Sequence, residues 1–140
     1  MLEKETVVVT DNDGDIDALE KKYENYIKKN KKQYIKICYD IDTHINQGGL
    51  KSKNGNFNYD TLEPCLVRAN NLQTLSKILK KAFQTEDDLI KYMVNNKTEC
   101  ALTIFESDIK LNYPTYIEEA IKWIKTNCWL LVQVQVKQHI

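Results

Sequence analysis

The chain has 140 residues, and 20 lysine plus arginine residues balance 20 aspartate plus glutamate residues, so its formal net charge is zero. This length suits one domain that can bury a real hydrophobic core. The charge balance demands neither a nucleic-acid nor a membrane partner, although a local basic patch can exist within a neutral total. No apolar run approaches the roughly 20 residues that a membrane span needs, so we expect no membrane partner.

The four cysteines are far apart in the sequence and form no C-x-x-C pair, which argues against a zinc site or a redox motif. Each has apolar neighbours, so we expect small buried hydrophobic side chains at Cys38, Cys65, Cys100 and Cys128. The N-terminus M-L-E-K-E-T is charged with both signs and lacks the apolar run of a signal peptide. These features predict a protein of the reducing cytoplasm.

The N-terminal part of the chain predicts a strand, a helix and a second strand. In residues 5–10, Glu5 is followed by the β-branched run T-V-V-V-T, which favours a short buried strand. Apolar side chains recur at helical spacing from Ile16 to about Asn30, and residues 34–39 form the second strand candidate. A strand, helix and strand with tight links are typical of a βαβ unit, so we expect the two strands to be parallel.

The rest of the chain predicts one long loop and then helices. Residues 43–60 hold three of the four glycines and show no apolar periodicity, which predicts a functional or mobile loop. From Thr61 onward the pattern is helical, with helices at about 86–95 and 97–107 and a last helix after Pro114. The tail, residues 129–140, alternates like a strand or is unrelated sequence.

A cluster of acids, T10-D-N-D-G-D15, directly follows the first predicted strand. Three interpretations are open. An EF-hand calcium loop would place acids on ligand positions, but its first position would be Val9, where an acid is required. A purely structural turn explains one or two acids, because aspartate favours turns and caps helices.

The third interpretation is a metal site at the carboxyl end of a parallel strand, where open α/β sheets place their active crevices. Asp11 and Asp13 leave the strand two residues apart and project to the same side, and Gly14 permits close approach of a phosphate. Such sites serve phosphoryl transfer or phosphodiester cleavage. Phosphatases of the haloacid dehalogenase type share the D-x-D-G pattern, but they usually have threonine in the place of Asp15.

Four segments together resemble the Toprim domain of OLD-family ATP-dependent nucleases. They are V7-V-V-T-D-N-D-G-D-I-D-A-L-E-K-K-Y, I35-K-I-C-Y-D, T61-L-E-P-C-L and N95-N-K-T-E-C-A-L, in order over roughly residues 5–126. The resemblance implies an α/β fold in which a parallel sheet lies between helices, followed by a mostly helical C-terminal part. It implies a partial Toprim domain over residues 1–128 that cleaves DNA with a divalent metal, behind an ATPase, in a family that includes phage-defence proteins.

The resemblance also implies roles for four residues. Asp11 and Asp13 match the D-x-D ligands of Mg²⁺ or Mn²⁺, and Glu63 matches the acid that completes the metal site. Lys97 matches a lysine that stabilises charge on the cleaved phosphate, as a cation near a developing negative charge does. The ordinary alternatives are a helix-terminal acid for Glu63 and a solvated lysine for Lys97. Outside the matched set, we expect capping or loop-anchoring roles for Asp40 and Asp42, and a surface role for His44.

Two departures from the family bear on activity. The first Toprim motif is a glutamate upstream of the D-x-D, and neither Glu3 nor Glu5 can occupy its place. The chain also lacks the Walker A motif G-x-x-x-x-G-K-[ST]. We therefore expect a C-terminal piece of a larger nuclease that needs a partner chain or associates with itself. The alternatives are a non-catalytic module of the same fold that binds DNA or a protein, and a helical interaction protein without metal.

Overall fold

The computed structural model describes residues 4–29 and 33–138, with residues 29 and 128–138 described by their backbone alone. The fold is mixed α/β, with a small parallel sheet and several helices. The chain divides into two compact units, one formed by residues 1–41 and 115–140 and the other by residues 42–114. None of the helices among the described residues is long and apolar enough to cross a membrane.

The first unit contains the predicted strand, helix and strand. Strand β1 (Thr6–Val9) pairs in parallel with β2 (Ile35–Cys38), in a register that joins Thr6 to Ile35 and Val9 to Cys38. The parallel βαβ prediction is therefore confirmed. The helix between them is interrupted, because α1 (Ile16–Lys22) ends at Tyr23 and the chain continues as a π-helical turn, η1 (Asn25–Lys29).

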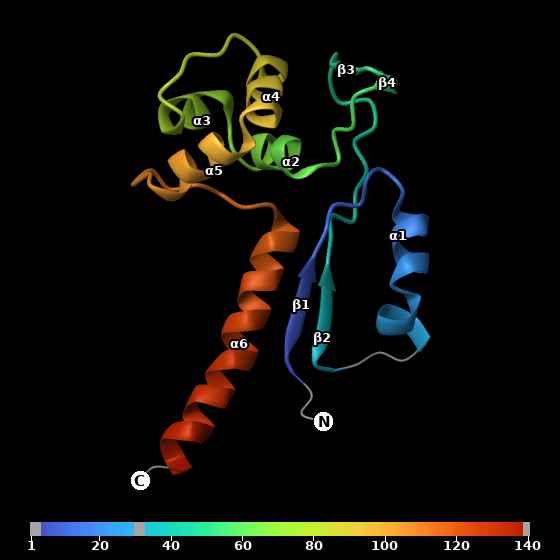
Figure 1. Ribbon diagram of the computed structural model, residues 1–140, viewed down its shortest axis with the longest axis vertical. Coiled ribbons are helices and arrows are strands. Elements are labelled where there is room, and N and C mark those ends of the chain that lie inside the picture. Colours follow the sequence, from blue (N-terminus) through green and yellow to red (C-terminus); the bar gives the residue numbers. More distant parts are fainter. Residues whose placement is uncertain (1–3, 30–32, 139–140) are drawn as a thin grey trace. The chain divides into compact units, whose positions relative to one another are not determined.

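Helix α6 (Thr115–Gln138) completes the first unit and packs against both strands, with α1 on the other side of the strands in Figure 1. It begins directly after Pro114, as predicted. The strand prediction for residues 129–140 is wrong as far as Gln138, because the backbone there continues the helix. No glycine or proline follows Pro114 to end it, and five alternating residues do not outweigh propagation of an established helix.

The second unit is helical around its own core. It contains α2 (Leu62–Ala69), α3 (Leu72–Ile78), α4 (Glu86–Asn95) and α5 (Lys97–Phe105), of which the last two lie close to their predicted ranges. Thr85 and Asp88 form a capping box that starts α4. The buried core is made of Tyr59, Leu66, Val67, Leu75, Ile78, Leu89, Ile90, Met93 and Cys100.

The predicted loop over residues 43–60 contains a small hairpin. Strand β3 (Lys51–Ser52) pairs antiparallel with β4 (Gly55–Asn56), and irregular backbone flanks both strands. Sequence periodicity could not show strands of two residues. The cysteine prediction is confirmed where the side chains are described, since the buried and free thiols are Cys38, Cys65 and Cys100. The side chain of Cys128 lies outside the described part.

Candidate functional site

The acidic turn, defined here as residues 10–15, begins one residue after β1 ends. Within it, Asp13 and Gly14 have positive φ angles of 53° and 77°. The Asp15 amide donates a hydrogen bond to the Asn12 carbonyl at 2.9 Å and closes the turn. Glycine adopts this backbone freely and aspartate tolerates it better than most residues, so the D-G pair suits the turn. A strand enters the turn, not the helix that an EF-hand requires.

Asn12 holds the turn in place, and the sequence analysis did not identify it. Its side chain is 2 % exposed. The amide nitrogen donates to the Asp40 carbonyl at 2.8 Å, and the amide oxygen accepts from the Gly14 backbone at 2.8 Å. Asn12 therefore ties the carboxyl end of β1 to that of β2. The sequence signal was the asparagine two residues before a glycine, which is typical of an Asx turn.

The structural interpretation of the acids accounts for Asp15. Its carboxylate accepts the Ala18 amide at 2.9 Å and caps α1. Asp15 also lines an open pocket of about 180 Å³ at the end of β1, together with Asp11, Asp13, Lys22 and Tyr23. The D-x-D pair thus stands where the sequence predicts it, at the carboxyl end of a parallel strand.

The structure brings together Glu63 and Lys97, the other two predicted residues. Glu63 lies in the first turn of α2 and is 8 % exposed, and Lys97 is the first residue of α5. The Lys97 ammonium nitrogen lies 2.8 Å from Glu63 Oε1. The other carboxylate oxygen, Oε2, is buried and has no hydrogen-bond partner among the described residues. A buried carboxylate oxygen without a donor is an energetically costly feature that a cation would relieve.

Asp11 and Asp13 belong to the first unit, and Glu63 and Lys97 belong to the second. The two predicted pairs therefore lie in different units. In the part of the chain that the structure describes, no group of three or more histidine, cysteine, aspartate or glutamate side chains is arranged to hold a metal ion.

His44 and Asp60 form a pair that the sequence analysis did not predict. Asp60 is 2 % exposed, and its Oδ1 accepts the His44 backbone amide at 2.7 Å and lies 3.1 Å from His44 Nδ1. Asp60 Oδ2 is buried without a hydrogen-bond partner in the described residues. The surface role expected for His44 is thus only partly correct, because its ring is half-buried against a carboxylate. Sixteen residues separate the two, so no local pattern could show the contact.

The second D-x-D, Asp40 and Asp42, lies just after β2. The Asp40 backbone carbonyl accepts a hydrogen bond from the Asn12 side chain, and the role expected for the Asp40 carboxylate stays a prediction. Asp42 is exposed and begins the second unit.

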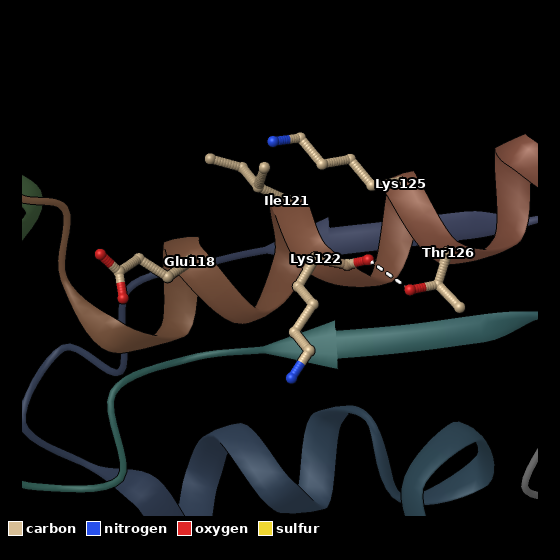
Figure 2. Close-up of a pocket in the computed structure, with 5 residues that line it drawn as sticks. All are labelled: Glu118, Ile121, Lys122, Lys125 and Thr126. Carbon is tan, nitrogen blue, oxygen red and sulfur yellow. Dashed lines mark hydrogen bonds between the residues drawn. The ribbon is translucent and has the colours of Figure 1, made fainter.

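A separate open pocket of about 410 Å³ lies on α6 and contains none of the predicted residues. Figure 2 shows Ile121 and Lys125 projecting from one side of the helix and Lys122 from the other. The Thr126 hydroxyl donates to the Lys122 carbonyl within the helix at 2.9 Å. The lining mixes Glu118 with two lysines, so it selects no single ligand charge.

The predicted ligand set fits a hard divalent cation by its chemistry. Asp11, Asp13 and Glu63 all offer carboxylate oxygens, which Mg²⁺ and Mn²⁺ prefer, and Glu63 contributes one that is buried and unpartnered. Comparison of the chain with protein-family models, with curated proteins and with solved structures found no match.

Proposed function

We propose that this chain is a Toprim-type, metal-dependent DNA endonuclease domain that hydrolyses phosphodiester bonds as part of an OLD-family ATP-dependent nuclease. The observation that carries the proposal is the position of Asp11 and Asp13. They stand two residues apart at the carboxyl end of a parallel strand pair and line an open pocket. Ligands of open α/β sheets bind in the crevice at this end of the strands.

Asp11 and Asp13 of the first unit would hold Mg²⁺ or Mn²⁺, and the Toprim resemblance implies Glu63 as a further ligand. When bound, the ion supplies Lewis-acid polarisation of a phosphoryl oxygen and a coordinated water of lowered pKa. The Lys97 ammonium, which neutralises Glu63 in this structure, would offset negative charge on the phosphate. Its place at the start of α5 adds the positive end of the helix dipole.

The proposal includes DNA and an ATPase domain or subunit as partners, together with association between copies of the chain. It also includes a reducing, cytoplasmic location, which the buried free thiols of Cys38, Cys65 and Cys100 support.

A Mn²⁺ titration of the purified chain beside Asp11→Asn and Asp13→Asn tests the metal site. Asparagine is chosen because alanine at the positive φ of Asp13 would add strain of about 1–2 kcal/mol. We expect each variant to weaken Mn²⁺ binding by about tenfold or more. Even the loss of a residue that only hydrogen-bonds to a metal ligand typically costs that much in metal affinity. The matched control is Asp17→Asn, an exposed carboxylate of α1 outside the pocket lining. Unchanged affinity in both turn variants would overturn the assignment.

Nicking of supercoiled plasmid DNA tests the reaction. Lys97→Met removes the proposed phosphate cation, so we expect cleavage to fall by roughly 10²-fold while Mn²⁺ affinity stays within a few-fold of the parent. Glu63→Gln should lower both cleavage and Mn²⁺ affinity. Equal cleavage by the parent chain and Lys97→Met would remove Lys97 from the proposed mechanism.

The second candidate is a non-catalytic binding module of the same fold. The observation in its favour is that Asn12 and Asp15 have structural roles in the acidic turn, as a strand tie and a helix cap. Metal binding without cleavage would support this module. A chain that binds neither Mn²⁺ nor DNA would instead support the third class, a helical interaction protein whose acidic turn is only structural.

A further inference from the structure

The segment from Thr43 to Tyr59, called here the hairpin segment, contains no acidic residue, although the whole chain balances acids and bases. It carries two lysines, Lys51 and Lys53, and a histidine. Its other polar side chains are mainly neutral amides, namely Asn46, Gln47, Asn54, Asn56 and Asn58. The segment is therefore a locally positive, amide-rich stretch within a neutral chain.

Two carboxylates outside the segment, one of them buried, hold it in one conformation. Asp60 accepts the His44 backbone amide at 2.7 Å near one end. Asp87, at the start of α4, accepts the Gly49 amide at 2.8 Å and the Tyr59 hydroxyl at 2.6 Å. The Tyr59 oxygen in turn accepts the Leu50 amide at 2.8 Å. These bonds neutralise no lysine of the segment, because their donors are backbone amides and a phenol.

Further contacts fix the base of the hairpin. Arg68 of α2 donates to the Gln47 side chain at 2.6 Å and to the Tyr59 carbonyl at 2.8 Å. Leu50 and Phe57, which flank β3 and β4, pack against the core of the second unit. A hairpin anchored in this way loses little conformational freedom when it binds a partner.

The hairpin tip presents its polar groups to solvent. Lys51 and Lys53 are both exposed, and the Lys51 ammonium donates to the Asn56 side chain across the strand pair at 2.9 Å. A pocket of about 150 Å³ opens beside the strands, and its polar lining includes Asn46, Lys51 and Asn56. Ammonium groups, side-chain amides and backbone amides are the donors that bind phosphate oxygens.

We propose that the hairpin segment is a DNA-backbone contact surface, with Lys51 and Lys53 as its phosphate contacts. The inference rests on the proposed function for its choice of DNA as the polyanion. Each lysine that neutralises a phosphate releases condensed counterions, so binding here depends on salt and not on base sequence. Phosphate binding also accounts for the length of the segment, since long loops in compact domains are usually functional.

The test measures binding of the full chain to a short fluorescein-labelled DNA duplex by anisotropy, in EDTA and over a range of salt concentrations. We compare the parent with Lys51→Gln/Lys53→Gln. The matched control is Lys77→Gln/Lys91→Gln, which removes two exposed lysines from α3 and α4 of the same unit. We expect the hairpin variant to bind about tenfold more weakly at 0.1 M salt, with a log–log salt slope smaller by about 2. The control should stay within about twofold of the parent, because its lysines make no phosphate contact.

Equal losses in the two double variants would show a general charge effect and overturn the inference. No DNA binding by the parent chain in EDTA would also overturn it. Because EDTA removes the metal, this test is independent of the Mn²⁺ titration. DNA binding that depends on the hairpin lysines, in a chain that binds no metal, would retain this inference and reject the endonuclease proposal. Metal-dependent cleavage, together with unchanged DNA binding by the hairpin variant, would retain the endonuclease proposal and reject this inference.

Discussion

Asn12 joins the ends of two strands through one buried side chain. Both hydrogen-bonding ends of its amide are used, one on the Asp40 carbonyl and one on the Gly14 amide. Side-chain amides that bridge backbone groups in this way hold a turn in one conformation. Asp11 and Asp13 flank Asn12, so the bridge holds the backbone that carries both carboxylates.

We predict that Asn12→Ala lowers the free energy of unfolding by about 1–3 kcal/mol, because it removes a buried side chain and leaves the part-buried Asp40 carbonyl and Gly14 amide without this partner. Urea denaturation followed by circular dichroism measures the change. Asn54→Ala in the exposed hairpin turn is the control and should stay within about 0.5 kcal/mol of the parent. Equal stability of the parent and Asn12→Ala would show that the amide bridge does not hold the turn.

Tyr59 makes the stability of the second unit depend on alkaline pH. Burial raises the pKa of the Tyr59 hydroxyl, and its hydrogen bond to Asp87 raises that pKa further. A raised pKa means that the folded chain keeps its proton after the unfolded chain has lost it. This contribution to stability is therefore complete below the ordinary tyrosine pKa of about 10 and declines as the pH rises above that value.

We predict that Tyr59→Phe is less stable than the parent at neutral pH, since Asp87 and the Leu50 amide lose a partner. The difference should narrow above about pH 10, where the parent alone loses the stability that the Tyr59 proton contributes. Urea denaturation at a series of pH values measures both parts. Parallel stability curves for the two proteins would contradict the assigned pKa shift.

At the scale of elements, the hairpin segment depends on close backbone packing at one glycine. A Cβ atom at Gly48 would collide with the Tyr59 hydroxyl and the Asp87 carboxylate, which anchor the segment. A Cβ atom at Gly49 would meet Asp87 only at 3.4 Å, an ordinary contact distance. Gly48 therefore has no room for a Cβ atom, whereas the adjacent Gly49 does.

We predict that Gly48→Ala destabilises the chain by about 1–3 kcal/mol, the usual cost of overpacking a filled site. Gly49→Ala should change stability by less than about 1 kcal/mol. Thermal denaturation of both variants measures the contrast, and hydrogen exchange locates the loss within residues 43–59. Equal effects at the two positions would mean that the Tyr59–Asp87 contact does not pack against Gly48.

Local sequence signals located most elements well and failed where two signals competed. The α4 prediction matches Glu86–Asn95, because a capping box marks its start and its apolar spacing is regular. The predicted helix from Ile16 breaks at Tyr23 and continues as a π-helical turn, a single-turn irregularity that apolar spacing does not mark. The strand prediction for the tail is wrong because Val-Gln alternation favours a strand locally, whereas α6 extends into the tail from Thr115.

At the scale of the whole molecule, each compact unit has a buried thiol that reports on it. Cys38 lies in the first unit and Cys100 in the second. Burial raises the pKa of both thiols, and nearby Glu99 and Glu63 raise that of Cys100 further. The thiolate is the reactive form, so a raised pKa and burial both slow alkylation.

We predict that Cys38 and Cys100 react with iodoacetamide much more slowly in the native chain than in urea. Peptide mass spectrometry across a urea series then gives the unfolding midpoint of each unit separately. Shared midpoints would show that the units unfold together, and different midpoints would show that they do not. Fast native labelling of Cys38 would contradict the packing of the first unit.

The sequence by itself determined the features that depend on near neighbours. These are the mixed α/β class, the parallel strand pair, the position of Asp11 and Asp13 at a strand end and most helix boundaries. Periodicity, caps and turn residues act over a few positions, so they can be read along the chain. Metal binding by the acidic turn stays a prediction. It rests on the carboxylate chemistry of Asp11 and Asp13, and no contact in the structure tests it.

Only the tertiary structure decided which distant residues meet. It joined Asn12 to Asp40, His44 to Asp60 and Glu63 to Lys97, and it left buried carboxylate oxygens on Asp60 and Glu63. It also packed α6 against the N-terminal strands β1 and β2 and divided the chain into two units. Such contacts arise because distant segments bury apolar surface together, and no local pattern of residues specifies that pairing.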